Sequence, residues 1–558
     1  MDKIWLKSYP PGVPADIDIS GFNSLGDVFA RSVRLYGSRT AYACMDKGIT
    51  YDELDRLTGQ FAGFLQGELG LPKGARVAIM MPNVLQYPIA AFAVLRAGYT
   101  VVNVNPLYTP RELEHQLKDS GATAIVILEN FCTTLQQVLK DAPIKTVVTT
   151  GLGDMLGFPK GTIVNFVVKH VKKMVPAWSI PDAIDFRDAL TRGSRHALKP
   201  VTVTLDDLAF LQYTGGTTGV AKGAMLTHRN IVSNLSQAFE WIKPFVREGE
   251  ETIFTALPLY HIFALTANCL TFMRLGATNV LIPNPRDIPG FVKELGKYRF
   301  SILTGVNTLF NALLNDPNFG RLDFSALKIT LGGGMAVQKA VADRWAEVTG
   351  KPLIEAYGLT ETSPAATMNP LNLKEYNGSI GLPVPGTDVT IRDDAGKDLG
   401  VGQAGELCVR GPQVMTGYYN RPDETAKVLM PDGFLRTGDV AVIDEQGFVR
   451  IVDRKKDMIL VSGFNVYPNE IEAVVAMHPA VLEVAAIGVP YEKSGEAVKV
   501  FIVRKDPSLT AEAVLAHCRE NMTGYKVPRF VEFREELPKT NVGKILRRAL
   551  RDEQKAAA

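Results

Sequence analysis

Strand and helix patterns alternate over most of this 558-residue chain, and this alternation limits the folds open to it. Runs rich in β-branched residues at Ala75–Met80, Thr100–Val104 and Ala124–Leu128 are separated by helix patterns at Leu85–Ala97 and Arg111–Ser120. Such alternation is typical of α/β folds with a mostly parallel sheet. A second set of the same kind follows in the middle of the chain. We therefore predict a large N-terminal α/β domain of parallel or mixed sheets.

The pattern changes in the last third of the chain. Short strand patterns and Gly, Pro and Asp turns dominate residues 382–452, which predicts a small β-rich unit. A charge cluster, Arg454–Asp457, then separates two apolar strand patterns, and a compact α+β pattern follows. Single cores stop growing near about 250–300 residues, so more than one domain is expected. We predict an N-terminal domain of residues 1–455, which includes the β-rich unit, and a C-terminal domain of residues 456–558 that moves on a hinge.

Composition argues against several classes of protein. The 61 basic and 59 acidic residues leave a net charge of +2, which gives no electrostatic case for nucleic-acid binding. Five scattered cysteines favour reduced thiols in a cytoplasmic enzyme over a disulfide framework. We see neither a secretory signal nor an apolar run of about 18 residues that would predict a membrane span.

The sharpest local signal is a loop rich in glycine and threonine, Tyr213–Gly223 (YTGGTTGVAKG). A strand pattern precedes it and a helix pattern at Thr227–Trp241 follows, so we expect the loop to join a strand to a helix. Glycines let backbone N–H groups approach a phosphate, and threonine hydroxyls and a lysine add donors. It is not a P-loop, because Ala221 precedes the lysine. Taken alone, the loop is also compatible with a flexible surface loop. The candidate ATP-binding residues here are Tyr213, Thr214, Gly215, Gly216, Thr217, Thr218, Gly219 and Lys222.

Four more motifs follow in order: Tyr357–Thr362 (YGLTET), Arg436–Asp439 (RTGD), Asp453–Lys456 (DRKK) and Pro538–Lys544 (PKTNVGK). Together with the loop they resemble the adenylate-forming superfamily of acyl-CoA synthetases, peptide-synthetase adenylation domains and firefly-type luciferases. Within it, the chain is most similar to the bacterial long-chain fatty-acid–CoA ligases, nearly from end to end.

The resemblance implies a two-step reaction that feeds fatty acid degradation and uptake. ATP and a fatty acid give an acyl-adenylate and pyrophosphate, and coenzyme A then takes the acyl group, which leaves AMP. Mg²⁺ is the implied cofactor. A ligase for medium-chain or aryl acids, a fatty acyl-AMP ligase that loads a carrier protein, and a non-catalytic binding module remain alternatives. Whether the chain forms a homodimer also stays open.

The resemblance also implies roles for single residues. Two anions meet in the first step, so positive charge is needed between them, and Lys544 is the implied catalytic cation. Glu361 and Thr214 would hold Mg²⁺, which prefers few carboxylates plus phosphate oxygens, and Thr360 would donate to the α-phosphate. Without the resemblance, Lys544 would be a solvated lysine in a basic tail. The implied adenine and ribose residues are Gly332, Gly333, Gly334, Tyr357, Gly358, Asp439 and Arg454.

The second step requires a thiol where Lys544 acts in the first. The family meets this requirement by rotating its C-terminal domain, and Lys456 matches the hinge position, while Ser462 and Gly463 would border the channel for coenzyme A. Taken alone, the hinge segment is also an exposed charged turn.

Two apolar segments bear on the substrate. Pro258–Leu265 lacks the aspartate of amino-acid-activating relatives, and its apolar residues suit an acyl chain. His261 within it either lines the acid site, acts in the switch between steps or is structural. Gly161–Pro176 has the pattern of a basic amphipathic helix. Such a helix either rests on the membrane surface, here the cytoplasmic face of the inner membrane, or packs on the protein's own core.

Overall fold

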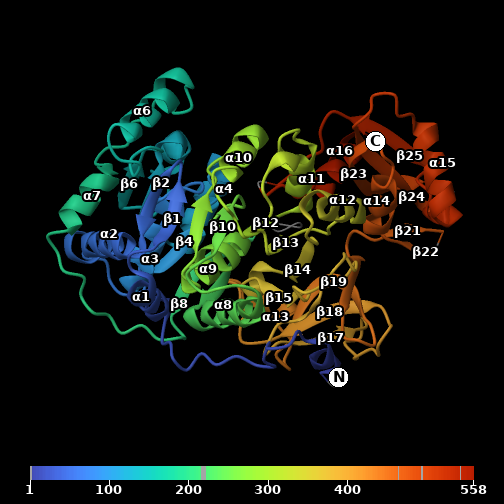
Figure 1. Ribbon diagram of the computed structural model, residues 1–558, viewed down its shortest axis with the longest axis horizontal. Helices are drawn as coiled ribbons and strands as arrows, with labels where there is room; N and C mark the ends of the chain where they lie inside the picture. The colour runs from blue at the N-terminus through green and yellow to red at the C-terminus, as the bar shows by residue number, and fades with distance from the viewer. Residues whose placement is uncertain (1–2, 215–220, 463, 492–493, 541, 558) are drawn as a thin grey trace.

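The computed structural model describes residues 3–214, 221–462, 464–491, 494–540 and 542–557. Within these ranges the strands form sheets of nine, seven, four and five strands. In Figure 1 the two large sheets and their helices fill the left and centre, the four-stranded sheet lies below, and the C-terminal part lies at the upper right.

The first predicted α/β set forms the seven-stranded sheet, in the order β7-β6-β5-β3-β4-β8-β9. All neighbours are parallel except β8 and β9. The three predicted strands and the two predicted helices between them are confirmed to within a few residues. The elements are β3 (Arg76–Met80), α3 (Gln86–Arg96), β4 (Thr100–Asn103), α4 (Pro110–Ser120), β5 (Ala124–Leu128), α5 (Cys132–Val138), β6 (Thr146–Thr150), β7 (Ile184–Asp185), α7 (Phe186–Gly193), β8 (Leu208–Thr214) and β9 (Lys222–Thr227).

Helix α4 illustrates how local sequence sets the ends of an element. The Thr109 hydroxyl accepts a hydrogen bond from the Glu112 N–H, and the Glu112 carboxylate accepts one from the Thr109 N–H, which makes a capping box. Pro110 suits the first turn because an N–H at this position would have no acceptor within the helix. Gly121 ends the helix in the left-handed region, at φ 62°.

The nine-stranded sheet has the order β16-β15-β14-β13-β12-β10-β11-β1-β2. The six strands from β14 to β1 are parallel, and antiparallel strands close both edges. Parallel β13 and β14 end at the same edge, where their C-terminal residues carry the glycine triplet and Tyr357. The strands are β1 (Thr40–Cys44), β2 (Lys47–Thr50), β10 (Thr252–Thr255), β11 (Thr278–Leu281), β12 (Ile302–Gly305), β13 (Ile329–Gly333), β14 (Ile354–Gly358), β15 (Ala365–Met368) and β16 (Leu382–Pro383).

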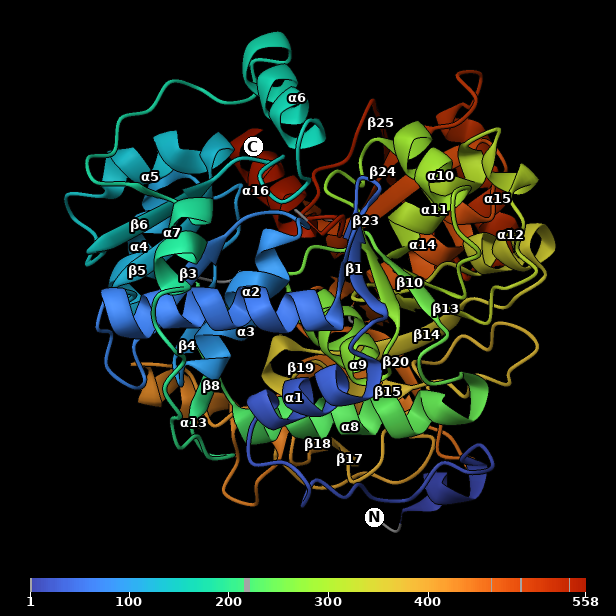
Figure 2. The same cartoon turned by 60° about the vertical axis from the view of Figure 1, so that its left-hand side comes forward.

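Helices cover the faces of these sheets (Figure 2). Sheets and helices bury a common core of aliphatic and aromatic side chains. No helix within the described ranges is long and apolar enough to cross a lipid bilayer. The remaining α-helices before the four-stranded sheet are α1 (Leu25–Tyr36), α2 (Tyr51–Gly63), α6 (Lys160–Phe166), α8 (His228–Ile242), α9 (Thr271–Arg274), α10 (Ile288–Leu295), α11 (Asn307–Asn315) and α12 (Lys339–Thr349).

Two smaller units follow. An antiparallel four-stranded sheet contains β17 (Asp388–Arg392), β18 (Gly405–Arg410), β19 (Leu435–Ile443) and β20 (Val449–Arg454), with α13 (Pro422–Val428) inserted. The last unit has its own core. It contains β21 (Ile459–Val461), β22 (Phe464–Val466), α14 (Pro468–Ala476), β23 (Val481–Tyr491), β24 (Gly495–Arg504), α15 (Ala511–Asn521), β25 (Phe530–Arg534) and α16 (Arg547–Ala557). The predicted fold class, a large α/β part with a small C-terminal α+β part, is confirmed. The domain limits 1–455 and 456–558 stay a prediction, and they fall in the turn between β20 and β21.

One local prediction is wrong. The glycine-rich loop does not lead straight into a helix, because β9 pairs antiparallel with β8 before α8 begins. The segment of β9, KGAMLT, has only one β-branched residue and a glycine, so its composition gave no strand signal. Lys222 is therefore the first residue of a strand, opposite Thr214.

Candidate active site

Lys544 lies against the edge where β13 ends. Gly334 follows β13 with a φ of +79°, and a Cβ added there would lie 3.1 Å from Cε of Lys544. The lysine side chain thus packs directly on glycine backbone. The neighbouring Gly543 carbonyl accepts a hydrogen bond from the Thr308 hydroxyl of α11 at 3.0 Å. These contacts bring the C-terminal loop onto the large sheet.

The surroundings of Lys544 disfavour its charged form. Burial, followed by repulsion from Arg454, lowers its pKa to about 8, although Asp439 and Glu361 act in the opposite direction. Within the described part of the chain the ammonium makes no salt bridge. A half-buried cation without a fixed counter-ion is suited to bind an anionic ligand.

Tyr357, Asp439 and Arg454 meet from three strands. The Tyr357 hydroxyl at the end of β14 donates to Oδ2 of Asp439 on β19 at 2.5 Å. Arg454 on β20 lies opposite Asp439 in the strand register, and its Nε is 3.5 Å from Oδ1. Burial raises the pKa of Asp439, and the Arg454 charge opposes that rise. The cluster presents a carboxylate beside an aromatic ring and a guanidinium.

Glycines line the same edge because backbone segments approach closely there. A Cβ on Gly358 would lie 1.9 Å from the Pro364 carbonyl oxygen, and one on Gly332 would lie 2.7 Å from a Val337 methyl group. A Cβ on Gly333 would lie 3.0 Å from the Phe263 ring. Larger residues would displace these neighbours, so the positions require glycine.

A polar chain links Glu361 to Lys222. Glu361 lies in the single 3-10 turn η8 (Thr360–Thr362) directly after β14, beside Thr360. Its Oε1 accepts a hydrogen bond from the Tyr418 hydroxyl at 2.6 Å. The Lys222 ammonium lies 4.5 Å from the centre of the Tyr418 ring and pairs with Glu424 of α13 at 2.8 Å. Lys222, predicted to bind phosphate, thus already has a carboxylate partner.

The glycine-rich loop is described only at its ends. The Tyr213 hydroxyl donates to Asp119 of α4 at 2.7 Å, and Thr214 pairs with Lys222. The predicted residues Gly215, Gly216, Thr217, Thr218 and Gly219 lie outside the described residues, as does Gly463.

His261 remains neutral near pH 7. Burial, followed by the charge of Lys544, lowers its pKa to about 3. Its Nδ1 lies 3.3 Å from the Phe263 backbone nitrogen, as an acceptor. This histidine therefore lies within the electrostatic influence of Lys544 as an uncharged imidazole.

The predicted hinge and channel residues lie on the C-terminal side of the site. Lys456 is in the turn between β20 and β21, and burial and Arg454 lower its pKa to about 8. Ser462 lies farther away in the turn between β21 and β22, with φ 51°, where its N–H donates to the Ser494 carbonyl. The structure thus brings Gly334, Glu361, Asp439 and Arg454 close to Lys544, while Ser462 belongs to the small sheet.

Sequence reasoning missed Tyr418, Glu424 and Asp119. Pro422 and two acidic residues in the first turn signal the start of α13. That signal does not predict the pairing with Lys222, because the partner lies 202 residues away along the chain.

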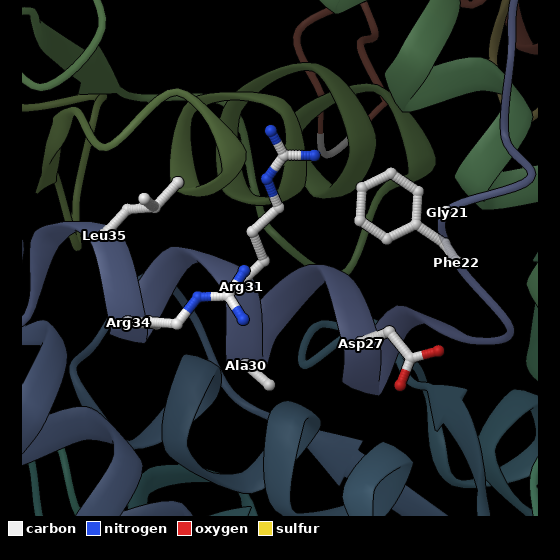
Figure 3. Close-up of a pocket in the computed structure, with 7 residues that line it drawn as sticks. All are labelled: Gly21, Phe22, Asp27, Ala30, Arg31, Arg34 and Leu35. Carbon is white, nitrogen blue, oxygen red and sulfur yellow. The ribbon is translucent and has the colours of Figure 1, made fainter.

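A separate pocket lies beside α1 (Figure 3). None of the predicted site residues lines it. Its lining consists of Gly21, Phe22, Asp27, Ala30, Arg31, Arg34 and Leu35.

Comparison with known families and proteins gives consistent matches. The profile of the AMP-binding enzyme family matches residues 29–419, and that of the AMP-binding enzyme C-terminal domain matches residues 470–544. A long-chain-fatty-acid–CoA ligase from Yersinia pestis is 61% identical over 554 residues, which cover 99% of this chain and 98% of that protein. A ligase with the same name from Bacillus subtilis is 37% identical over 99% of this chain and 98% of its own length.

Solved structures agree in fold. An anthranilate–CoA ligase, AuaEII, in complex with anthranoyl-AMP matches with a TM-score of 0.86 at 25% identity, over 97% of this chain and 99% of its own. ATP-bound MatB from Rhodopseudomonas palustris matches with a TM-score of 0.81 at 28% identity, over 96% of this chain and 99% of its own.

Proposed function

The chain belongs to the AMP-binding enzyme family, and we propose that the cluster around Lys544 is where it activates its substrate. The protein is a long-chain-fatty-acid–CoA ligase that uses ATP and coenzyme A to make acyl-CoA, with AMP and pyrophosphate as the other products. The observation that supports this site most directly is the half-buried Lys544 ammonium, which lies near Gly334, Asp439 and Glu361 and has no salt-bridge partner among the described residues.

In the first step, a carboxylate oxygen of the fatty acid attacks the α-phosphorus of ATP. A new P–O bond forms, the bond to the β-phosphate oxygen breaks, and pyrophosphate leaves. Lys544 would lie between the two anions and offset their repulsion, which is worth most in a site shielded from water. Asp439 would accept hydrogen bonds from the ribose hydroxyls, and Tyr357 would lie against adenine.

Mg²⁺ fits the donor set of this site. Among the described residues no group of three or more His, Cys, Asp or Glu side chains is arranged to hold a metal ion. A metal here would depend on Glu361, with the Thr214 hydroxyl and phosphate oxygens, and Mg²⁺ prefers such a site with few carboxylates. When bound, it would neutralise phosphate charge.

In the second step, the thiol of coenzyme A loses its proton to solvent and its sulfur attacks the acyl carbon, so that a C–S bond forms, the C–O bond to the AMP phosphate breaks and AMP leaves. Lys544 must withdraw for the thiol to enter, so we propose rotation of the C-terminal part about Lys456. A turn with few backbone hydrogen bonds between two sheets suits such a hinge. Ser462 and Gly463 would then border the pantetheine chain.

The test separates the two steps. Lys544→Ala should lower acyl-adenylate formation by about 10²–10³-fold, while thioester formation from acyl-adenylate supplied ready-made should change little. Pyrophosphate release with fatty, medium-chain and aryl acids, with and without coenzyme A, distinguishes the rival ligases. Equal loss of both steps would contradict the role of Lys544.

We also propose that the protein is cytoplasmic and binds peripherally to the inner face of an anionic membrane. Helix α6 and the π-helical turn η4 (Val167–Val171) stand out from the body of the protein (Figure 2). Of the 13 large hydrophobic residues that are exposed among the described residues, five lie between positions 158 and 174. They are Phe158, Ile163, Phe166, Val171 and Met174.

Basic residues flank this apolar surface. Lys169, His170, Lys172 and Lys173 are exposed on η4 and just after it. Val168 packs on the protein, so the segment is attached to the core on one side and open on the other. Exposed apolar groups edged by cations fit an interface of acyl chains and anionic headgroups.

Vesicle sedimentation tests this surface. Phe166→Glu should reduce binding to phosphatidylglycerol vesicles, whereas Leu35→Glu, a comparably exposed apolar position on α1, should not. Equal binding by both variants and the unchanged protein would rule out this segment as the contact.

A further inference from the structure

A buried cluster of charged side chains surrounds the turn between β20 and β21, beside the active site but not part of it. Asp453, the next-to-last residue of β20, has a side chain that is 0% exposed. Its partner Arg547 is the first residue of α16, and its side chain is 13% exposed. Charges this deeply buried are stable only when they are paired, so their partners define the arrangement of the chain around them.

We call the turn between β20 and β21, which contains Lys456, the joint. The Arg547 guanidinium has one carboxylate partner before the joint and one after it. Its Nη1 is 3.1 Å from Oδ1 of Asp453, which precedes the joint. Its Nε and Nη2 donate to the two oxygens of Glu472 on α14, at 2.8 and 2.6 Å, and Glu472 follows the joint. Asp453 also accepts a hydrogen bond from the Asn469 N–H at 2.7 Å.

A rotation about the joint would affect the Arg547–Glu472 pair and the Arg547–Asp453 pair differently. Glu472, Asn469 and Arg547 all belong to the C-terminal unit and move together. Asp453 belongs to β20, which pairs with β19 in the four-stranded sheet. A rotation at Lys456 therefore preserves the pair with Glu472 and separates Arg547 and the Asn469 N–H from Asp453.

Arg547 is rigidly connected to Lys544. The Thr540 N–H donates to the Lys544 carbonyl at 2.7 Å, and the Lys544 N–H donates to the Thr540 hydroxyl at 3.1 Å. The Leu546 N–H donates to the Pro538 carbonyl, which closes a tight loop just before Arg547. The position of the guanidinium thus fixes the position of the loop that carries Lys544.

Asp453 is also rigidly connected to the other half of the site. It is adjacent to Arg454, which lies opposite Asp439 in the register of β19 and β20. An Asp453–Arg547 pair therefore holds the Lys544 loop against the strands that carry the candidate ribose carboxylate.

We propose that Asp453 is a positioning residue for the first half-reaction, because its ion pair with Arg547 holds the C-terminal unit where Lys544 faces the nucleotide. The inference rests on the proposed roles of Lys544 and Lys456. Two further pairs surround this one, Arg547 with Asp457 at 3.5 Å and Arg551 with Asp457 at 2.8 Å. Both lie after Lys456 and move with the C-terminal unit, so among the ion pairs of this cluster only that of Asp453 with Arg547 is broken by the rotation.

The buried carboxylate of Asp453 favours the docked arrangement energetically. In the described arrangement burial raises the pKa of Asp453, and the charge of Arg547 opposes that rise. After rotation the carboxylate loses the guanidinium and the Asn469 N–H, and of these contacts it keeps only the Arg454 N–H, at 2.7 Å. Loss of one partner from a buried pair is strongly unfavourable, so the pair biases the enzyme toward the arrangement for adenylation.

The experiment compares the half-reactions in Asp453→Asn and in Glu472→Gln. Asp453→Asn keeps the shape of the side chain and should lower acyl-adenylate formation about tenfold. Thioester formation from supplied acyl-adenylate should stay within about twofold of the unchanged enzyme. Glu472→Gln removes a carboxylate from the same guanidinium but within one unit, so it should lower both half-reactions by similar factors together with the melting temperature.

The outcomes are distinguishable. Similar losses of both half-reactions in Asp453→Asn, or no loss in either, would overturn the proposal, and so would the same selective loss in Glu472→Gln. If Asp453→Asn does not fold, Asp453→Ser, which leaves room for water, takes its place in the same comparison. Absence of acyl-adenylate from the unchanged enzyme would instead contradict the proposed function itself.

Discussion

The pKa of Lys544 predicts how the first half-reaction depends on pH. Burial and Arg454 favour the neutral amine and lower the pKa to about 8. Only the protonated lysine can neutralise two anions, so activity should be lost as the pH rises through this value. The protonated fraction is about 0.9 at pH 7 and about 0.1 at pH 9, which follows from a pKa of about 8. The kcat/KM for ATP should therefore fall about tenfold between these two pH values.

The nucleotide itself should change this profile. A bound triphosphate is strongly negative and favours the protonated amine, so the pKa of Lys544 should rise in the complex. At saturating ATP the fall in kcat should therefore shift to higher pH than the fall in kcat/KM. The assay is pyrophosphate release from ATP and a fatty acid without coenzyme A, over a range of pH values at constant ionic strength.

Substitutions test whether Lys544 causes the fall in kcat/KM with pH. Lys544→Arg keeps a cation throughout this range, so its residual kcat/KM should no longer fall between pH 7 and 9. Lys456 and the buried Glu355 also have a pKa of about 8, so Lys456→Arg and Glu355→Gln serve as controls that should retain the fall. A flat profile in the unchanged enzyme, or an unchanged fall in Lys544→Arg, would refute the reasoning.

Three more predictions concern the hinge, the phosphate loop and the metal. Lys456→Pro should slow thioester formation more than adenylation, as single-turnover measurements of each step would show, because a fixed φ restricts the turn. Glu424→Gln should free Lys222 and lower the KM for ATP about two- to fivefold, the scale of a partly exposed ion pair; an unchanged KM would contradict competition between Glu424 and phosphate. EDTA should stop acyl-adenylate formation but leave the melting temperature unchanged, because the proposed metal arrives with ATP; a clear drop in melting temperature would indicate a structural metal.

The fold was largely predictable because its parallel strands are buried on both faces. Such strands appear in the sequence as short β-branched runs, as in β5, where all five residues are buried. Strand β9 was missed because its side chains do not carry that signal. It forms only because β8 and the segment around Tyr418 supply partners on its two sides, including a bond from the Tyr419 N–H to the Gly223 carbonyl.

Resemblance predicts which side chains make up the candidate site, but it does not predict the contacts between them. Tyr357, Asp439 and Arg454 were named as nucleotide residues, and their meeting depends on three strands from two different sheets. The pairing of Lys222 with Glu424 could not be inferred, because two opposite charges far apart in sequence have many other possible partners. Local motifs therefore predict candidate side chains, whereas the topology decides which of them are in contact.

The burial of the basic C-terminal segment also could not be predicted from the sequence. By composition, Lys544, Arg547 and Arg551 belong to a run of cations that would ordinarily be solvated. A guanidinium buried like that of Arg547 requires several acceptors, and its carboxylate partners Glu472 and Asp453 lie 75 and 94 residues earlier in the chain. Because Asp453 precedes the joint and Arg547 follows it, this burial is possible only when the C-terminal unit is docked. If the docked arrangement is the one that adenylates the substrate, the Arg547 guanidinium is paired with Asp453 only when the enzyme is ready for the first half-reaction. Composition alone would have placed this guanidinium in solvent.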